Sequence, residues 1–170
     1  LYATCQKYQL RLFIDGARLG YGLMSEACEY DLPYVAEHCD VFYIGGTKVG
    51  AMFGEAVVFS GMKAPKYFFT NVKRHGALLA KGRMLGIQFD TLFTDELYFK
   101  ISKHAINMAA GIRKIFAKHN IPLAYDSPTN QQFVILSPTL YQALSKLVAF
   151  EIWEKKNEQE IVCRFVTSWA

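Results

Sequence analysis

Two short apolar segments, residues 10–14 and 41–44, place the strongest constraint on the fold, because each leads into a functional side chain. The first segment delivers Asp15 at its carboxyl end, and the second is followed by a glycine-rich turn that carries Lys48. Short apolar runs bounded by glycine are typical of buried strands. Open α/β sheets bind ligands at the carboxyl ends of their strands, so we expect both side chains at the ligand-binding edge of one strand–helix–strand unit.

The two residue types match the chemistry of pyridoxal phosphate. An acid can keep the pyridine nitrogen of this cofactor protonated, and a lysine can form a Schiff base with its aldehyde. Each residue also has a simpler explanation. Asp15 could cap the next helix through its carboxylate, and Lys48 could be a solvated side chain in a turn. The pair, at the spacing of one strand–helix–strand unit, favours a pyridoxal phosphate site.

Composition excludes several other classes of protein. The chain has 170 residues and 52% hydrophobic content, which suits one folded domain or slightly more. It has neither a long uncharged apolar run nor a basic-then-apolar amino terminus, so we expect a cytoplasmic protein without membrane segments. The net charge of +4 is mild and gives little support for nucleic acid binding. The widely spaced cysteines predict neither a zinc site nor disulfides, and we expect free thiols at Cys5, Cys28, Cys39 and Cys163.

Basic side chains gather between residues 63 and 83, where they could serve a phosphate group. We predict a loop at residues 71–76 and a long helix from Ala77 onward, because the later apolar residues follow mainly helical spacing. Lys81 would then lie in the first turns of that helix and could face a cofactor phosphate across the end of the sheet. A solvated basic face explains the same residues equally well.

The second half of the chain changes architecture. The helical pattern breaks near residues 90–96, and a second amphipathic run covers residues 100–119. A strand is predicted at residues 132–136, a helix start at Ser137 and Pro138, and an antiparallel hairpin from residues 150–153 and 161–167. We therefore predict one unit over residues 1–95 and a smaller α+β unit over residues 96–170.

These motifs resemble the low-specificity threonine aldolases of the aromatic amino acid β-eliminating lyase and threonine aldolase superfamily. The resemblance lies in the Asp-Gly-Ala-Arg motif at residues 15–18, the Lys48 loop after Asp40 and the strand pattern at residues 54–59. It implies a fold-type-I pyridoxal phosphate enzyme of the α/β class, with a seven-stranded mixed sheet and a smaller carboxyl-terminal α+β domain. Residues 1–95 would be the carboxyl-terminal part of the large, cofactor-binding domain.

The chain corresponds to the second half of a typical family member. The resemblance therefore implies that the residue stacking on the cofactor ring and the phosphate-binding loop belong to a preceding half. We expect this chain to be part of a longer enzyme. Family members usually form a homodimer or homotetramer with sites at the subunit interfaces, and their substrate is a small amino acid.

The resemblance also implies roles for individual residues. Asp15 would pair with the pyridine nitrogen, and Lys48 would carry the cofactor. Arg18 would lie near the phenolic oxygen of the cofactor or the substrate carboxylate, although it could instead only pair with Asp15. Arg164 would bind the substrate carboxylate, and a structural salt bridge is the competing explanation for an arginine in a central strand.

One segment departs from the family pattern. Many members have a Gly-Gly-Gly-Met-Arg run where this chain has Ala77-Leu78-Leu79-Ala80-Lys81. Lys81 is therefore a substituted candidate for the phosphate, and Arg74 is a second. The departure leaves the reaction open between two lyase types, and the catalytic base is not identified.

The implied reaction is cleavage of the Cα–Cβ bond of threonine or a related β-hydroxy amino acid, which gives glycine and an aldehyde. Loss of a β-substituent after cleavage of the Cα–H bond uses the same electron sink, so a β-eliminating lyase is the nearest alternative. A non-catalytic fragment, whose exposed sheet edge and apolar faces are normally covered by the missing half, is a third possibility.

Overall fold

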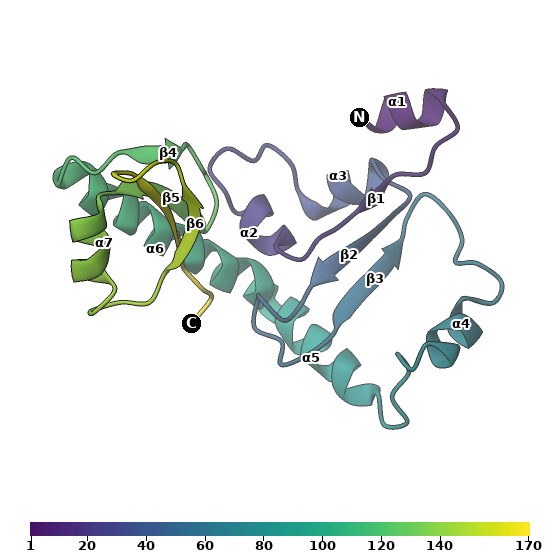
Figure 1. The fold of residues 1–170 in the computed structure, drawn as a ribbon. Coiled ribbons are helices and arrows are strands. Elements are labelled where there is room, and N and C mark those ends of the chain that lie inside the picture. The colour runs from purple at the N-terminus through teal and green to yellow at the C-terminus, as the bar shows by residue number, and fades with distance from the viewer.

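Two sheets joined by one long helix make up the structure (Figure 1). The computed structural model describes residues 1–170. The first sheet has the order β1-β2-β3 and consists of β1 (Phe13–Ile14), β2 (Val41–Gly45) and β3 (Glu55–Phe59). β1 runs parallel to β2, whereas β3 is antiparallel to it. The predicted strand–helix–strand unit is confirmed, and parallel pairing brings the carboxyl ends of β1 and β2 to the same edge.

Seven α-helices and one 3₁₀ turn accompany the sheets. Their bounds are α1 (Tyr2–Lys7), α2 (Leu19–Leu23), α3 (Leu32–Glu37), α4 (Phe68–Arg74), α5 (Arg83–Phe93), η1 (Thr94–Glu96), α6 (Leu97–Lys118) and α7 (Pro138–Leu144). Helices α2 and α3 lie between β1 and β2 in the chain, and α5 follows β3 and α4. No helix has both the length and the apolar character needed to cross a membrane.

A buried carboxylate fixes the pairing of β1 with β2. Asp40, which precedes β2, is 1% exposed. Its Oδ2 accepts a hydrogen bond from the backbone N–H of Leu12 at 2.8 Å, and its Oδ1 accepts one from Arg11 Nη1 at 2.9 Å. The hydrogen bond from Leu12, assisted by Arg11, holds the pKa of Asp40 below its usual range. These contacts fix the register in which Phe13 lies opposite Val41.

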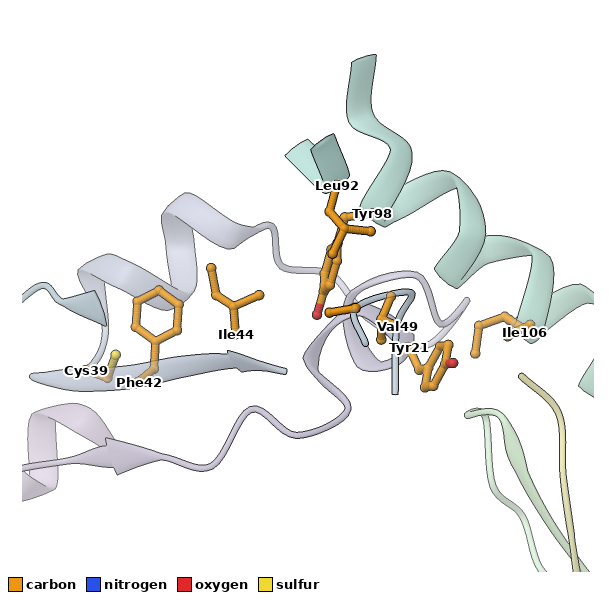
Figure 2. Close-up of a cluster of buried hydrophobic side chains, with 10 residues drawn as sticks. Tyr21, Cys39, Phe42, Ile44, Val49, Leu92, Tyr98 and Ile106 are labelled. Atoms are coloured by element: carbon orange, nitrogen blue, oxygen red, sulfur yellow. The ribbon is translucent and has the colours of Figure 1, made fainter. Parts of the chain in front are cut away.

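Helix α6 belongs to both hydrophobic cores. Its first half contributes Tyr98, Ala105 and Ile106 to the core beneath the first sheet, shown in Figure 2. Its second half contributes Phe116 to the core of the second sheet. The predicted break before this helix is confirmed, because Asp95 and Glu96 have φ values of 49° and 58°. The predicted division into residues 1–95 and 96–170 stays a prediction.

The second sheet is antiparallel throughout and has the order β4-β5-β7-β6. Its strands are β4 (Leu123–Tyr125), β5 (Gln131–Leu136), β6 (Glu151–Lys155) and β7 (Ile161–Val166). The predicted hairpin is therefore confirmed as β6 and β7. The predicted helix start is also confirmed, because Ser137 Oγ accepts a hydrogen bond from the backbone N–H of Leu140 and Pro138 occupies the first turn of α7.

The prediction for residues 71–81 is wrong. Residues 71–74 belong to α4, and the next helix, α5, begins only at Arg83. Gly76 has a φ of +72° and ends α4 in the left-handed conformation typical of helix carboxyl termini. Lys81 therefore lies in the turn before α5, outside the first turns of a helix.

Candidate active site

Asp15 lies directly after β1, with one carboxylate oxygen engaged and the other free. Its Oδ1 accepts hydrogen bonds from the backbone N–H of Ala17 at 3.1 Å and from the hydroxyl of Tyr43. Oδ2 makes no hydrogen bond in the structure. The contact with Ala17 is a local turn, because α2 begins at Leu19 and its cap residue is Arg18. Asp15 is therefore not the cap of this helix.

Lys48 lies three residues after the end of β2 in a tight turn. Backbone hydrogen bonds from Val49 and Ala51 to the carbonyl of Gly46, at 2.9 and 3.0 Å, close this turn. The carboxylate of Glu55 fastens it to β3 by accepting a hydrogen bond from the N–H of Gly46 at 2.6 Å. The side chain of Lys48 is exposed, and its amine makes no hydrogen bond or ion pair.

The positive charge of Lys48 acts on Asp15. The hydrogen bond from Tyr43 lowers the pKa of Asp15 most, followed by the hydrogen bond from Ala17, and the positive charge of Lys48 lowers it further. Asp15 is therefore a carboxylate at neutral pH. A free carboxylate oxygen and a free primary amine thus share one edge of the sheet.

Two glycines allow the turn after β1 to pack directly on the end of β2. The backbone N–H of Gly45 donates to the carbonyl of Gly16 at 2.9 Å. A Cβ atom on Gly16 would lie 1.7 Å from the carbonyl oxygen of Tyr43, and one on Gly45 would lie 2.4 Å from that of Ala17. Neither position has room for a side chain. The backbones that carry Asp15 and Lys48 therefore meet in direct contact.

Buried tyrosine hydroxyls hold these backbones together. Tyr98 of α6 is fully buried, accepts a hydrogen bond from the N–H of Gly20 at 3.1 Å and donates one to the carbonyl of Gly45 at 3.0 Å. Tyr21 of α2 is also buried and donates to the carbonyl of Lys48. Figure 2 shows both rings beyond the carboxyl end of β2, on the side toward α6. Burial raises the pKa of Tyr98 to about 12, so its hydroxyl stays protonated.

We expect Tyr98→Phe to lower the free energy of unfolding by about 1–3 kcal/mol, because it leaves a buried N–H and a buried C=O without their partner. Urea unfolding of the full-length protein measures this loss. Tyr141→Phe is the matched control, since that half-buried hydroxyl makes no hydrogen bond in the structure. Equal stability of the two variants would contradict the linking role of Tyr98.

Arg18 is placed near the pair but does not bond to Asp15. It is half-buried at the start of α2, and no hydrogen bond or ion pair engages its guanidinium. The alternative that Arg18 only pairs with Asp15 is therefore not what the structure shows. Burial raises the pKa of Tyr21, and the positive charge of Arg18 opposes this shift.

Arg164 is engaged within the second sheet. On β7 it donates to Glu151 of β6 and to Gln131 Oε1 of β5, the latter at 3.1 Å. Its guanidinium also lies 5.1 Å from the ring centre of Trp153. The structural salt bridge considered for this arginine is therefore present, and no hydrogen bond joins Arg164 to Asp15 or Lys48. Its Nε is buried and makes no hydrogen bond.

The two phosphate candidates lie in the segment between β3 and α5. Arg74 is the last residue of α4, and Lys81 follows in a turn; both are exposed. Neither makes a hydrogen bond or ion pair with another residue of this chain. Figure 1 shows α4 at the end of a long connection that stands away from the first sheet. The structure therefore brings the backbones that carry Asp15 and Lys48 together. Arg74 and Lys81 lie elsewhere, in the segment between β3 and α5.

Two bacterial relatives match most of this chain. The low-specificity L-threonine aldolases of a Pseudomonas species and of Pseudomonas aeruginosa are each 30% identical over 149 residues, which cover 84% of this chain and 41% of theirs. A solved structure of Leishmania major threonine aldolase is 38% identical, covers 99% of this chain and superimposes with a TM-score of 0.96. The chain belongs to the threonine aldolase family.

Membership of the threonine aldolase family confirms the resemblance seen in the sequence, and the predicted α/β fold is confirmed with it. A structure from Exiguobacterium sp. 255-15, assigned to the aromatic amino acid β-eliminating lyases and threonine aldolases, shares this fold at 16% identity with a TM-score of 0.65. No protein-family model matches the chain. The chain spans 49% of the Leishmania protein and 41% of the Pseudomonas proteins, so it covers less than half of these relatives.

The sequence did not predict the three tyrosines that support the site. Tyr43 could have been found from the strand pattern. Residues two apart on a strand share a face, and the expected pairing of the strands before Asp15 and Lys48 puts Tyr43 beside Asp15. Tyr21 lies in a helix of five residues without a clear pattern. Tyr98 is separated from Gly45 by 53 positions, and no local signal indicates that they meet.

Proposed function

We propose that the protein containing this chain is a pyridoxal phosphate-dependent lyase that cleaves the Cα–Cβ bond of threonine or related β-hydroxy amino acids. The observation that carries the proposal is the pair formed by the free Oδ2 of Asp15 and the free amine of Lys48 at one sheet edge. The names of the threonine aldolase relatives support it. The products would be glycine and an aldehyde.

The residues present fit this cofactor. A protonated pyridine nitrogen needs a carboxylate, and Asp15 has one oxygen without a partner. An aldehyde needs an amine to react with, and the amine of Lys48 is exposed and makes no hydrogen bond or ion pair. Both groups sit on backbone whose position is fixed by glycine contacts and buried hydroxyls, as a preorganised site requires.

Each residue has a distinct task in the proposed reaction. When bound, pyridoxal phosphate supplies a sink for the electrons released when a bond at the substrate α-carbon breaks. Asp15 would hold the proton on the ring nitrogen, and Lys48 would hold the cofactor through its amine. Arg18, which has no other partner here, would orient the phenolic oxygen of the cofactor or the substrate carboxylate.

The remaining roles rest on the resemblance to the family. Arg164 would bind the substrate carboxylate by exchanging Glu151 for the substrate. Arg74 and Lys81 would contribute to a phosphate site, and their exposure leaves them available for it. We also propose a cytoplasmic homodimer or homotetramer. The apolar groove of about 370 Å³ that includes Ile115, Val148 and Val166 is one surface available for contact.

The decisive test incubates the full-length protein with threonine, allo-threonine, serine and a cysteine conjugate, and identifies the products. We expect glycine and acetaldehyde from both threonine isomers, because the relatives of this chain are named for low specificity. Pyruvate and ammonia from the conjugate, without glycine from either isomer, would favour β-elimination instead. Absence of all products from a protein that binds the cofactor would favour the non-catalytic alternative.

A further inference from the structure

Tyr43 and Asp15 are brought together by the strand pairing itself. Phe13 lies opposite Val41 and Ile14 opposite Phe42, so continuing this parallel register places Asp15 beside Tyr43. Phe42 and Ile44 are buried in the core, and alternation along β2 therefore directs Tyr43 to the opposite face of the sheet. The ring of Tyr43 packs against that of Phe13, with their centres 6.0 Å apart.

The hydroxyl of Tyr43 selects one oxygen of Asp15. It donates to Oδ1, the same atom that accepts the hydrogen bond from the N–H of Ala17. Two donors on one oxygen fix the rotation of the carboxylate about its Cβ–Cγ bond. Oδ2 is then the oxygen left to meet an incoming donor.

We propose that Tyr43 is a positioning residue for Asp15, which holds Oδ1 so that Oδ2 is presented to the protonated ring nitrogen of a heterocyclic cofactor. The inference rests on the proposed function and deepens it. A carboxylate without Tyr43 would keep only the contact with Ala17 and could turn. The carboxylate of Asp15 would then lose its rotational freedom only when the cofactor binds, and this cost lowers the affinity for the cofactor.

The hydrogen bond also sets the basicity of the carboxylate. The contact with Tyr43 is the largest cause of the lowered pKa of Asp15, and the same contact raises the pKa of Tyr43 to about 12. The tyrosine therefore stays a donor throughout the physiological range. Asp15 stays ionised, as an acceptor for a ring N–H must be.

The first measurement needs no cofactor chemistry. The full-length apoprotein is prepared with ¹³C-labelled aspartate carboxyls, and Asp15→Asn identifies the signal of Asp15. We expect Tyr43→Phe to raise the pKa of Asp15 toward its ordinary value, since the charged form loses a donor. Tyr125→Phe is the matched control, because it removes a comparable hydrogen bond to Glu154, of 3.3 Å, in the second sheet.

The second measurement is the dissociation constant of pyridoxal phosphate, followed by fluorescence. We expect Tyr43→Phe to weaken binding about tenfold, as for a lost hydrogen bond to a charged group, and Tyr125→Phe to leave it unchanged. We expect Asp15→Asn to weaken cofactor binding. If it does, an unchanged pKa of Asp15 in Tyr43→Phe, or an unchanged affinity of this variant for pyridoxal phosphate, overturns the role of Tyr43. Unchanged binding in Asp15→Asn overturns the proposed cofactor site itself.

Discussion

Replacing Lys48 with arginine is expected to lower turnover by on the order of 10³-fold or more, because a guanidinium cannot supply the nucleophilic amine. The substitution keeps the positive charge near Asp15, and Lys48 is exposed without side-chain partners, so the fold should persist. Activity with threonine measures the loss. Borohydride reduction followed by peptide mapping shows which lysine carries the cofactor.

The control for this substitution is Lys146→Arg, at an exposed position after α7 in the carboxyl-terminal half. We expect it to retain turnover, and the pyridoxyl group to stay on the peptide that contains Lys48. Recovery of the group on another lysine in the native protein would refute the assignment. Full turnover of Lys48→Arg would refute it equally.

Replacing Gly16 with alanine is expected to destabilise the protein by about 3 kcal/mol or more, at the upper end of overpacking effects. The added Cβ would lie 1.7 Å from the carbonyl oxygen of Tyr43, and the obstruction is backbone that cannot rotate away. The turn after β1 must then separate from the end of β2. Chemical denaturation measures the change, and pyridoxal phosphate binding should weaken as Asp15 moves relative to Lys48.

Gly22→Ala supplies the contrast within the same segment. Gly22 lies in α2, and a Cβ there meets no atom within 4 Å. Alanine is favoured over glycine in a helix, so we expect stability to be unchanged or higher by up to about 1 kcal/mol. Similar losses at both positions would show that the contact between the two backbones is not the cause.

Local patterns were sufficient to predict the strands that form the site. The apolar runs before Asp15 and Lys48 gave β1 and β2, and their parallel pairing followed from the intervening helices. Ser137 and Pro138 likewise identified the start of α7 through capping chemistry. These features depend on neighbours in the sequence, so the sequence carries the information directly.

The segment after β3 was mispredicted because two signals competed. Leu78 and Leu79 suggested that a helix begins at Ala77, after a loop at residues 71–76, whereas Gly76 has the conformation that ends a helix. Both leucines are exposed in the structure. Interpreting Gly76 as the end of a helix would have indicated α4 before it, in place of the predicted loop.

The partners of Arg164 and of the site backbone could not be predicted for a different reason. Glu151 meets Arg164 through the pairing of β6 with β7, and Tyr98 reaches Gly45 from α6. Such contacts depend on how elements pack in three dimensions, and a sequence alone gives no distance between them. Whether Arg164 also binds a substrate carboxylate stays a prediction.

Helix α6 also connects the motions of the two halves. Tyr98 near its start bonds to the site backbone, and Phe116 near its end lies in the core of the second sheet, roughly 27 Å away at 1.5 Å per residue. An unbroken helix of this length behaves as a stiff rod. A tilt of the second sheet would therefore be carried along α6 to Gly20 and Gly45, the two backbone groups that share the hydroxyl of Tyr98, and would move them together.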